Sequence, residues 1–149
     1  MSPESELYYF CKPTETLATG LPVEFLTVQE FLADEAACKM LWELLDTQFR
    51  TRSKFLAIWK TVSYVVIHRD TENSVDGLLL LTTPVNWQID YVVVRPDARG
   101  QGIAGALVKA AVSQAYLQKA PYVMLTSKES LRPLYEACGF EVVKSSCPV

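Results

Sequence analysis

The feature that most constrains the fold lies between residues 87 and 117, where a strand pattern passes through a glycine-rich turn into a helix pattern. Trp87–Val94 is rich in aromatic and β-branched residues, which predicts a strand. The turn follows as "RPDARGQGIAGAL" (Arg95–Leu107), and Pro96 ends the strand before the glycines begin. Small and apolar residues then recur at helical spacing as far as Ala115. Because a glycine-lined turn at a helix N-terminus presents backbone N–H groups, we expect it to bind an anion.

The first candidate anion is a nucleoside triphosphate, because Gly100 and Gly105 form the G-x-x-x-x-G pattern of a phosphate loop. Such a loop needs a lysine and then a serine or threonine after the second glycine, to reach the phosphates and to hold Mg²⁺. Ala106 and Leu107 stand there instead. The residues therefore argue against a phosphate loop.

The second candidate is a dinucleotide, because Gly100, Gly102 and Gly105 spell G-x-G-x-x-G. Glu129 stands near the position of a ribose-binding acid. In that fold, however, the first strand runs straight into the glycines, whereas "RPDA" intervenes here. Beyond the helix that the turn opens, only two strands and one helix are predicted, where a dinucleotide domain needs several strand–helix units. A dinucleotide is therefore the weaker alternative.

The remaining segments predict an α/β fold with one mixed central sheet flanked by helices. We expect strands at Val23–Val28, Val62–Arg69, Leu78–Thr83, Val123–Thr126 and Phe140–Val143. We expect helices at Gln29–Phe49, at Thr51–Lys60, and from an N-cap at Ser130 to Cys138, with Gly139 at its C′ position. Residues 23–149 are predicted to form the domain, and residues 1–22 an N-terminal extension with a short strand at Leu7–Cys11.

Composition narrows the class of protein further. The chain has 14 basic and 17 acidic residues, a net charge of −3, and no run of basic residues, so no nucleic-acid partner is expected. Its apolar runs are too short to span a bilayer, so no membrane partner is expected. The four cysteines lack the spacing of metal ligands, so no metal is expected, and the N-terminus lacks a signal-peptide pattern. These features predict a cytoplasmic protein with reduced thiols.

A third sequence pattern accounts for the whole stretch. "VRPDARGQGIAGAL" resembles V-x-P-x-x-R-G-x-G-I-[GA]-x-x-L, the pyrophosphate-binding pattern of the GNAT superfamily of N-acetyltransferases. "LYEACGF" (Leu134–Phe140) resembles the family's L-Y-x-x-x-G-F segment, and the order of elements matches from about Val23 to Val143. The resemblance implies the acyl-CoA N-acyltransferase fold. It also implies transfer of acetyl from acetyl-CoA to a primary amine, without a covalent enzyme intermediate.

The resemblance also assigns the cofactor-binding residues. The pantetheine arm is expected in a gap where Trp87–Val94 splays from Val123–Thr126. Backbone groups of the first strand would meet the pantetheine and the thioester, and amides of the turn would hold the diphosphate. The predicted cofactor-binding residues are Val92, Val93, Val94, Arg99, Gly100, Gln101, Gly102, Ile103 and Ala104.

Two side chains are candidates for proton transfer. Tyr135 falls on the family's tyrosine, often the general acid that protonates the departing thiolate, and a phenol can donate near neutral pH. Asp90 is the candidate general base, as the only carboxylate on its strand. Gln88 lies two residues away on the same face, near where some members place a glutamate, but an amide cannot accept the proton. A neutral amine or a water molecule is the alternative, and a non-catalytic acyl-CoA-binding sensor is the alternative function.

The chain also departs from the family pattern. Lys128 stands where many members carry an asparagine that contacts the cofactor. Lys128 or Arg132 is either a solvated surface charge, which is the favoured interpretation, or an alternative contact for CoA phosphate. The family's seventh strand has no counterpart after Phe140–Val143. Either that strand is missing or another segment covers the edge, and Leu7–Cys11 is the candidate segment, within the chain or across a homodimer. The acceptor amine, small molecule or protein, is left open. Residues expected to shape its pocket or the core are Trp42, Phe49, Phe55 and Trp59. His68 and Cys138 are expected to be structural.

Overall fold

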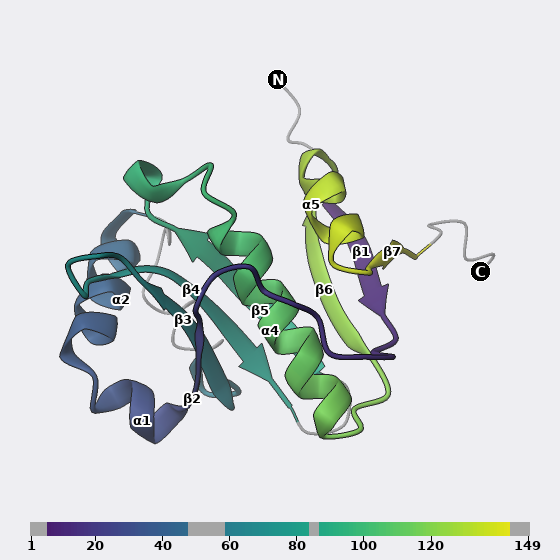
Figure 1. Cartoon of the computed structure of the whole chain (residues 1–149), viewed down its shortest axis with the longest axis horizontal. Coiled ribbons are helices and arrows are strands. Elements are labelled where there is room, and N and C mark those ends of the chain that lie inside the picture. Colours follow the sequence, from purple (N-terminus) through teal and green to yellow (C-terminus); the bar gives the residue numbers. More distant parts are fainter. Residues whose placement is uncertain (1–5, 48–58, 84–86, 144–149) are drawn as a thin grey trace.

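One seven-stranded sheet organises the chain, with its strands in the order β2-β3-β4-β5-β6-β1-β7 (Figure 1). The computed structural model describes residues 6–47, 59–83 and 87–143. Its strands are β1 (Glu6–Cys11), β2 (Glu24–Thr27), β3 (Tyr64–Arg69), β4 (Val75–Thr82), β5 (Trp87–Val94), β6 (Val123–Lys128) and β7 (Glu141–Val142). All neighbouring strands are antiparallel except β5 and β6, which run parallel. This mixed sheet confirms the predicted fold class.

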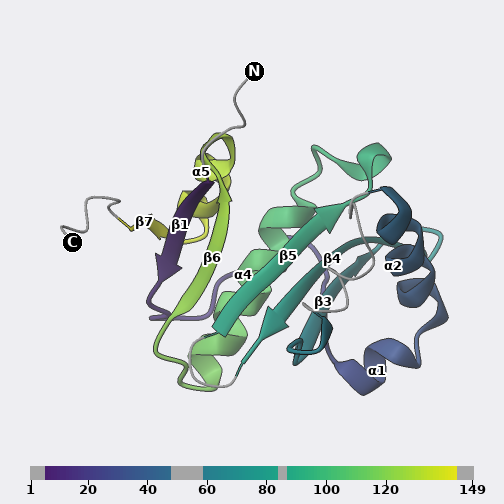
Figure 2. The same ribbon diagram turned by 180° about the vertical axis from the view of Figure 1, so that it is seen from behind.

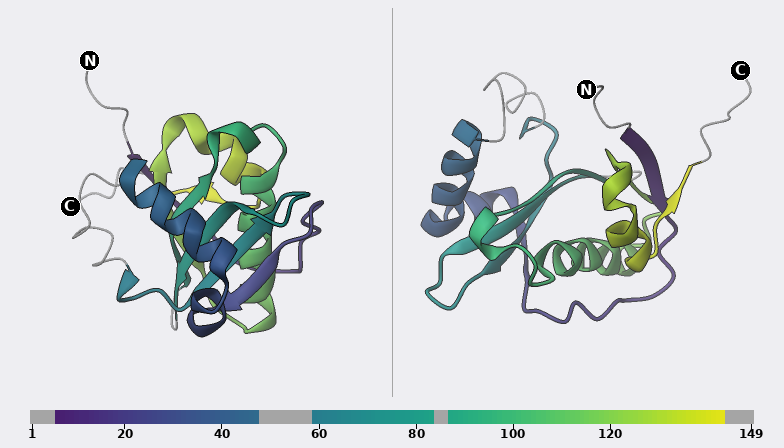
Figure 3. Two further views of the ribbon diagram at one scale, coloured as in Figure 1. Left: turned by 90° about the vertical axis from the view of Figure 1, so that its left-hand side faces the viewer. Right: turned by 90° about the horizontal axis from the view of Figure 1, so that it is seen from above.

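Helices cover the two faces of the sheet unequally. The long helix α4 (Ile103–Leu117) lies on one face, and α1 (Val28–Leu32) and α2 (Glu35–Thr47) lie on the other (Figures 2 and 3). The short helix α5 (Arg132–Ala137) lies beside β6 and β1, after a 3₁₀ turn, η2 (Glu129–Leu131). The larger core cluster lies beneath α4, where one apolar stripe of the helix is buried, as its helical spacing predicts.

Local patterns placed most elements correctly. β5 has the predicted bounds, and β3 and β4 form the predicted hairpin. However, β4 begins three residues earlier than predicted, at Val75, because its turn needs only Asp70–Ser74 to reverse the chain. The helix expected at Thr51–Lys60 falls mostly on residues 48–58, outside the described residues.

The predicted single helix Gln29–Phe49 is wrong in one respect, because the chain forms two helices with a break at Ala33–Asp34. Thr27 caps α1 in a capping box with Glu30. The Asp34 carboxylate accepts a hydrogen bond of 3.0 Å from the Ala37 amide at the start of α2. Since an aspartate satisfies a free amide best at a helix start, it favours a new helix there over continuation.

Ser130 is not the N-cap of α5, which corrects a second prediction. β6 continues to Lys128, and the chain then turns through η2, so that Ser130 lies inside this turn and Leu131 becomes the N-cap. Pro133 occupies the first turn of α5, where its missing N–H costs nothing. Gly139 follows the helix with φ 93°, which agrees with its predicted C′ position.

The N-terminal strand β1 lies inside the sheet, between β6 and β7. It pairs with β6 from Glu6 opposite Lys128 to Cys11 opposite Val123, and with β7 at Tyr9 and Phe10. Of the two arrangements left open for Leu7–Cys11, the structure shows pairing within the chain. The segment predicted as an extension therefore contributes a strand to the sheet.

Candidate functional site

The candidate site is a wedge between β5 and β6. These parallel strands pair only at Trp87 with Val123 and at Gln88 with Met124, and then diverge (Figure 2). The splaying expected from the resemblance is therefore present. Beyond Gln88, the edge of β5 that faces β6 has no strand partner among the described residues. Backbone groups along this edge are available to a ligand.

A β-bulge at Asp90 changes which residues of β5 face the wedge. Leu80 pairs with Tyr91 and Leu81 pairs with Ile89, so Asp90 has no opposite residue on β4. The alternation of side chains therefore changes phase at the bulge. Ile89 packs into the core beneath α4, whereas after the bulge Tyr91 packs toward α1 and α2. Val92 and Val94 return to the α4 side, where the wedge is.

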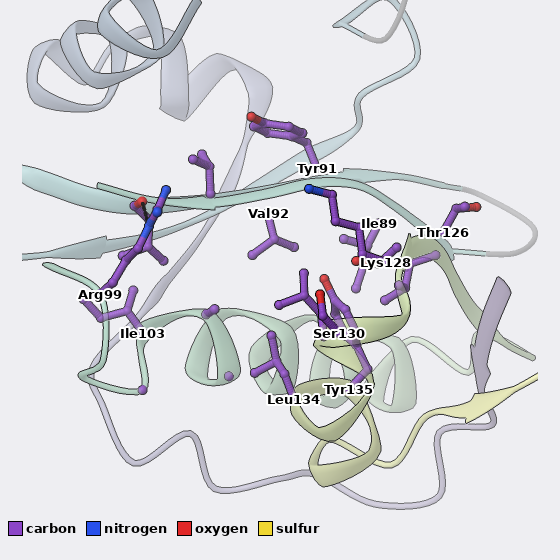
Figure 4. Close-up of a pocket in the computed structure, with 18 of the residues that line it drawn as sticks. Ile89, Tyr91, Val92, Arg99, Ile103, Thr126, Lys128, Ser130, Leu134 and Tyr135 are labelled. Carbon is purple, nitrogen blue, oxygen red and sulfur yellow. Dashed lines mark hydrogen bonds between the residues drawn. The ribbon is translucent and has the colours of Figure 1, made fainter. Parts of the chain in front are cut away.

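The wedge holds a cavity of about 830 Å³ that brings the predicted residues together (Figure 4). Its lining includes Asp90, Val92, Val93, Val94, Arg99, Gly100, Gly102, Ile103, Ala104 and Tyr135. Gln101 is the exception among the predicted residues, because it lines a separate, smaller cavity behind the turn. The strand, the glycine turn and α5 thus supply three walls of one site.

The glycine turn, Arg95–Gly102, has the geometry of an anion site. Gly100 and Gly102 have φ values of 82° and 81°, which favour glycine, and a Cβ at either position would meet no atom within 4 Å. Gly102 is the N-cap of α4 and makes no side-chain cap, so the first amides of this helix lack side-chain partners. The Arg99 side chain donates to the Val94 carbonyl over 3.4 Å, between the turn and the strand. These features leave the amides open to the cavity.

Gly105, the third glycine of the dinucleotide pattern, is not required for close packing of α4 against its neighbours. A Cβ at Gly105 would lie 3.7 Å from Leu134, which is an ordinary contact, and its φ is not positive. In a dinucleotide site this glycine permits close packing of the helix on the strand. Close packing occurs instead at Gly77 of β4, where a Cβ would lie 2.6 Å from Ile103.

Tyr135 lies on α5 with 5% of its surface exposed, and its side chain points into the cavity (Figure 4). Its ring packs between Tyr9 and Phe140, with centroid distances of 5.2 Å and 6.0 Å. Burial raises the pKa of Tyr135, and a side-chain hydrogen bond with Ser127 opposes this effect. The phenol therefore keeps its proton at neutral pH and can donate it.

Asp90 accepts a hydrogen bond from the Thr82 hydroxyl on the neighbouring strand. The Thr82 hydroxyl also lies 3.3 Å from the Thr61 hydroxyl, so the two hydroxyls and the Asp90 carboxylate form one row of polar contacts. Burial raises the pKa of Asp90, while the Thr82 hydrogen bond lowers it. A carboxylate with a raised pKa is a better proton acceptor than an exposed one.

The other residues singled out in the sequence are divided between the site and the rest of the protein. Lys128 lines the cavity, whereas Arg132 does not and lies 3.3 Å from Glu136 along α5. His68 is buried against Asp76, and Cys138 is a buried thiol. Trp42 is exposed and Trp59 packs on Phe31, while Phe49 and Phe55 lie outside the described residues.

Some residues of the site were not anticipated from the sequence. Glu6, Leu125, Thr126, Ser127 and Ser130 also line the cavity. Thr82 could have been found, because it faces Gln88 across a hairpin that the pattern predicts. Glu6 and Tyr9 carried no such signal, since the sequence offered β1 a place beside Phe140–Val143 but did not indicate its pairing with β6.

The described residues contain neither a cluster of metal-ligating side chains nor a helix suited to a membrane. No cluster of three or more His, Cys, Asp or Glu side chains that could hold a metal ion occurs among residues 6–47, 59–83 and 87–143. Over the same ranges, no helix has the length and apolar character needed to cross a membrane.

The sequence matches one family model, described as "Acetyltransferase (GNAT) domain", over residues 57–142. This is more than half of the chain, and it includes the strand, the glycine turn and the tyrosine helix that form the wedge. No curated protein matches the sequence.

Solved structures match the fold over most of the chain. A GCN5-related N-acetyltransferase from Sphaerobacter thermophilus has a TM-score of 0.73 and 19% identity, over 93% of this chain and 48% of its own. A GNAT-family protein from Novosphingobium aromaticivorans DSM 12444 has a TM-score of 0.67 and 16% identity, over 95% and 61%. A ribosomal-protein-alanine N-acetyltransferase from Brucella melitensis biovar Abortus 2308 has a TM-score of 0.61 and 19% identity, over 87% and 98%. The chain thus spans about half to three fifths of the first two proteins.

Proposed function

Because this chain belongs to the GNAT acetyltransferase family, we propose that it transfers an acetyl group from acetyl-CoA to a primary amine. The amine nitrogen would attack the thioester carbonyl carbon directly, and the CoA thiolate would leave. The observation that carries the proposal is the glycine turn, whose uncapped helix amides open into the same cavity as Tyr135.

The chain's residues fit the parts of acetyl-CoA in order along the wedge. The amides from Arg99 to Ala104 are suited to the diphosphate, since the N-terminal end of a helix attracts negative charge. The unpaired edge of β5 at Val92–Val94 offers backbone groups to the pantetheine and to the thioester oxygen. The bound thioester would supply the activated acetyl group.

Tyr135 and Asp90 would move the protons. Tyr135 would protonate the leaving thiolate, which its position in the cavity and its retained proton support. Asp90 would take the proton of the arriving ammonium, directly or through water, and its raised pKa supports this role. Asp90 is among the residues that line the cavity, and the bulge leaves no residue of β4 opposite it.

The first test is isothermal titration of the protein with acetyl-CoA, with NADH as a second ligand. The variant Gly102→Glu forces a side chain into a left-handed backbone position and places a carboxylate beside the diphosphate. We expect it to weaken acetyl-CoA binding at least about tenfold, because juxtaposed like charges cost several kcal/mol. NADH should not bind.

Gly20→Glu is the matched control. Gly20 also has a positive φ, 76°, and open space around it, but it lies outside the cavity. The control therefore carries the same charge and a similar backbone strain, and it should keep acetyl-CoA binding. Equal loss in both variants would assign the effect to folding, and absence of binding by the folded wild type would overturn the proposal.

Turnover then separates an enzyme from a binding module. Release of free thiol would be followed with a panel of polyamines, amino acids and peptides with free N-termini. Peptides are included because a matching structure is named as a ribosomal-protein-alanine N-acetyltransferase. Thiol release that depends on one class of amine would support the proposal. Tight binding without turnover on any class would favour the sensor alternative.

A further inference from the structure

We propose that Asp70 and Arg95 form a strut that holds the diphosphate turn, Arg95–Gly102, from behind. Both are positioning residues, since neither lines the cavity of the wedge. The proposal rests on the proposed function, because it concerns how the turn is kept ready for a diphosphate.

The side of the turn that faces away from the wedge borders a second cavity. Gly100 and Gly102 line the wedge, whereas Asp97 and Gln101 line a second cavity of about 550 Å³, and Ala98 lines both. The turn is therefore a thin wall between two cavities. Ala98 is buried in the core beneath α4, whereas Asp97 and Gln101 border the second cavity, so packing holds only part of the turn. Other contacts must hold the amides in place.

Arg95 supplies these contacts at the start of the turn. Its amide donates to the Asp76 carbonyl over 2.8 Å, and its carbonyl accepts from the Ala98 amide over 2.9 Å. Its guanidinium Nη2 donates to Asp70 Oδ2 over 2.9 Å, across the second cavity's lining. One residue thus ties the turn to the β3–β4 hairpin through both its backbone and its side chain.

Asp70 is itself held rigidly, which makes it a firm anchor. Its Oδ1 accepts hydrogen bonds from the amides of Glu72 and Ser74, over 2.9 Å and 3.0 Å. Its own amide donates to the Ser74 carbonyl over 2.8 Å. One carboxylate oxygen therefore closes the hairpin turn, and the other is left for Arg95. These hydrogen bonds to the charged form lower the pKa of Asp70.

The base of the hairpin is equally fixed. Asp76 accepts the Arg95 amide with its carbonyl, and its buried carboxylate lies 2.6 Å from His68 Nδ1. The next residue, Gly77, allows Ile103 at the start of α4 to pack against β4. The hairpin therefore holds both ends of the diphosphate turn: Arg95 at its beginning and Ile103 just after its end. The ion pair therefore lies on the side of the turn that borders the second cavity.

The test uses Arg95→Met, Asp70→Asn and the double variant in the whole chain. Asparagine keeps an oxygen for the Glu72 and Ser74 amides, so the hairpin turn should persist. Acetyl-CoA binding should weaken about tenfold in each single variant, as expected for losing a hydrogen bond between charged groups. The double variant should lose no more than Arg95→Met alone, since Arg95→Met already removes the contact with Asp70. Arg95→Lys should fall between wild type and Arg95→Met.

Two readouts separate positioning from general destabilisation. Acetyl-pantetheine carries the thioester arm without the diphosphate, so its affinity should be the same in wild type and in the variants. Amide hydrogen exchange in the unliganded protein should accelerate at residues 95–102 and stay unchanged in α4 and β3. Glu136→Gln breaks the ion pair with Arg132 on α5 and is the matched control, with no expected change in either readout.

The outcomes distinguish the positioning role of the Asp70–Arg95 pair from a general stabilising role and from failure of the proposed function. Unchanged acetyl-CoA affinity in Arg95→Met and Asp70→Asn would overturn the strut. Equal losses for acetyl-CoA and acetyl-pantetheine, with faster exchange throughout, would show a general stabilising role and overturn it as well. Failure of wild type to bind acetyl-CoA would overturn the proposed function, while the exchange measurement would still test the strut without a ligand.

Discussion

At the scale of single residues, two side chains with hydroxyl groups are central to the proton transfer proposed for the wedge. Tyr135 is nearly buried, and its ring is held between Tyr9 and Phe140. Thr82 holds the carboxylate of Asp90 from the neighbouring strand. In each case one oxygen can be removed while the packing of the rest of the side chain is largely kept.

Tyr135→Phe removes the proposed acid and keeps the ring. We expect kcat to fall about 10²- to 10⁴-fold, which is the usual contribution of a general acid. The dissociation constant of acetyl-CoA should change little. The measurement is thiol release with the amine that the screen identifies, beside titration of acetyl-CoA. An unchanged kcat would show that Tyr135 only packs in the site.

Thr82→Val should shift the acid limb of the pH profile of kcat/KM. The hydroxyl stabilises the charged form of Asp90, so its loss raises the pKa of this carboxyl further. A base must be deprotonated to act. As the pH is lowered, the variant should therefore lose activity at a higher pH than wild type does. Thr82→Ser keeps the donor and should leave the limb in place. Identical profiles for all three proteins would argue against Asp90 as the base.

At the scale of elements, short polar contacts decide where helices begin. The break between α1 and α2 depends on Asp34, which accepts the Ala37 amide and forms an ion pair with Arg69 of β3. This pair connects the start of α2 to the sheet. The pKa of Asp34 is lowered, with the Arg69 hydrogen bond as its largest cause.

Asp34→Ala should lower the free energy of unfolding by roughly 1–3 kcal/mol, because a cap and a partly buried ion pair are both lost. Asp34→Asn keeps the cap and should lose only the ion pair. Since the folded pKa is lowered, the pair's contribution is present above the ordinary aspartate pKa and disappears as pH falls through the folded value. Denaturant unfolding at pH 7 and at acid pH measures this, and a pH-independent loss in Asp34→Asn would contradict it.

At the scale of the whole molecule, the N-terminal strand completes the sheet beside the site. β1 lies between β6 and β7, and the Tyr9 hydroxyl donates to the Lys128 carbonyl over 3.3 Å. The Tyr9 ring, also on β1, packs against the ring of Tyr135 on α5. The first strand in the sequence therefore supports one wall of the wedge, although the rest of the wedge is built more than seventy residues later.

Tyr9→Ala tests this support, and Tyr8→Ala is its matched control. Tyr9 is fully buried, so its truncation should cost about 3–5 kcal/mol of stability, as for other large aromatic residues. Tyr8 lies next to it on the opposite face of β1 with 65% of its surface exposed, and its truncation should change stability by less than about 0.5 kcal/mol. Thermal and denaturant unfolding measure both. Equal effects would show that β1 contributes little to the core.

Short-range patterns predicted much of the fold and the site. β5 was predicted with its bounds, because β-branched residues and Pro96 mark its length locally. The site residues on β5, on the turn and on α5 line one cavity, apart from Gln101. Asp34 is itself a local signal for a new helix start, but the helical spacing of the apolar residues predicted one continuous helix instead. The bulge at Asp90 had none, because it depends on how β5 pairs with β4.

What the sequence determined by itself is the strand, the glycine turn and the helix that follows, because allowed backbone angles and side-chain periodicity act between near neighbours. Only the tertiary structure decided that β1 enters the sheet between β6 and β7, that β5 and β6 diverge after Gln88, and that Asp70 meets Arg95. These pairings join segments distant in the chain. Which partner a segment takes depends on the burial and hydrogen bonding of the whole sheet, and no local pattern contains that information.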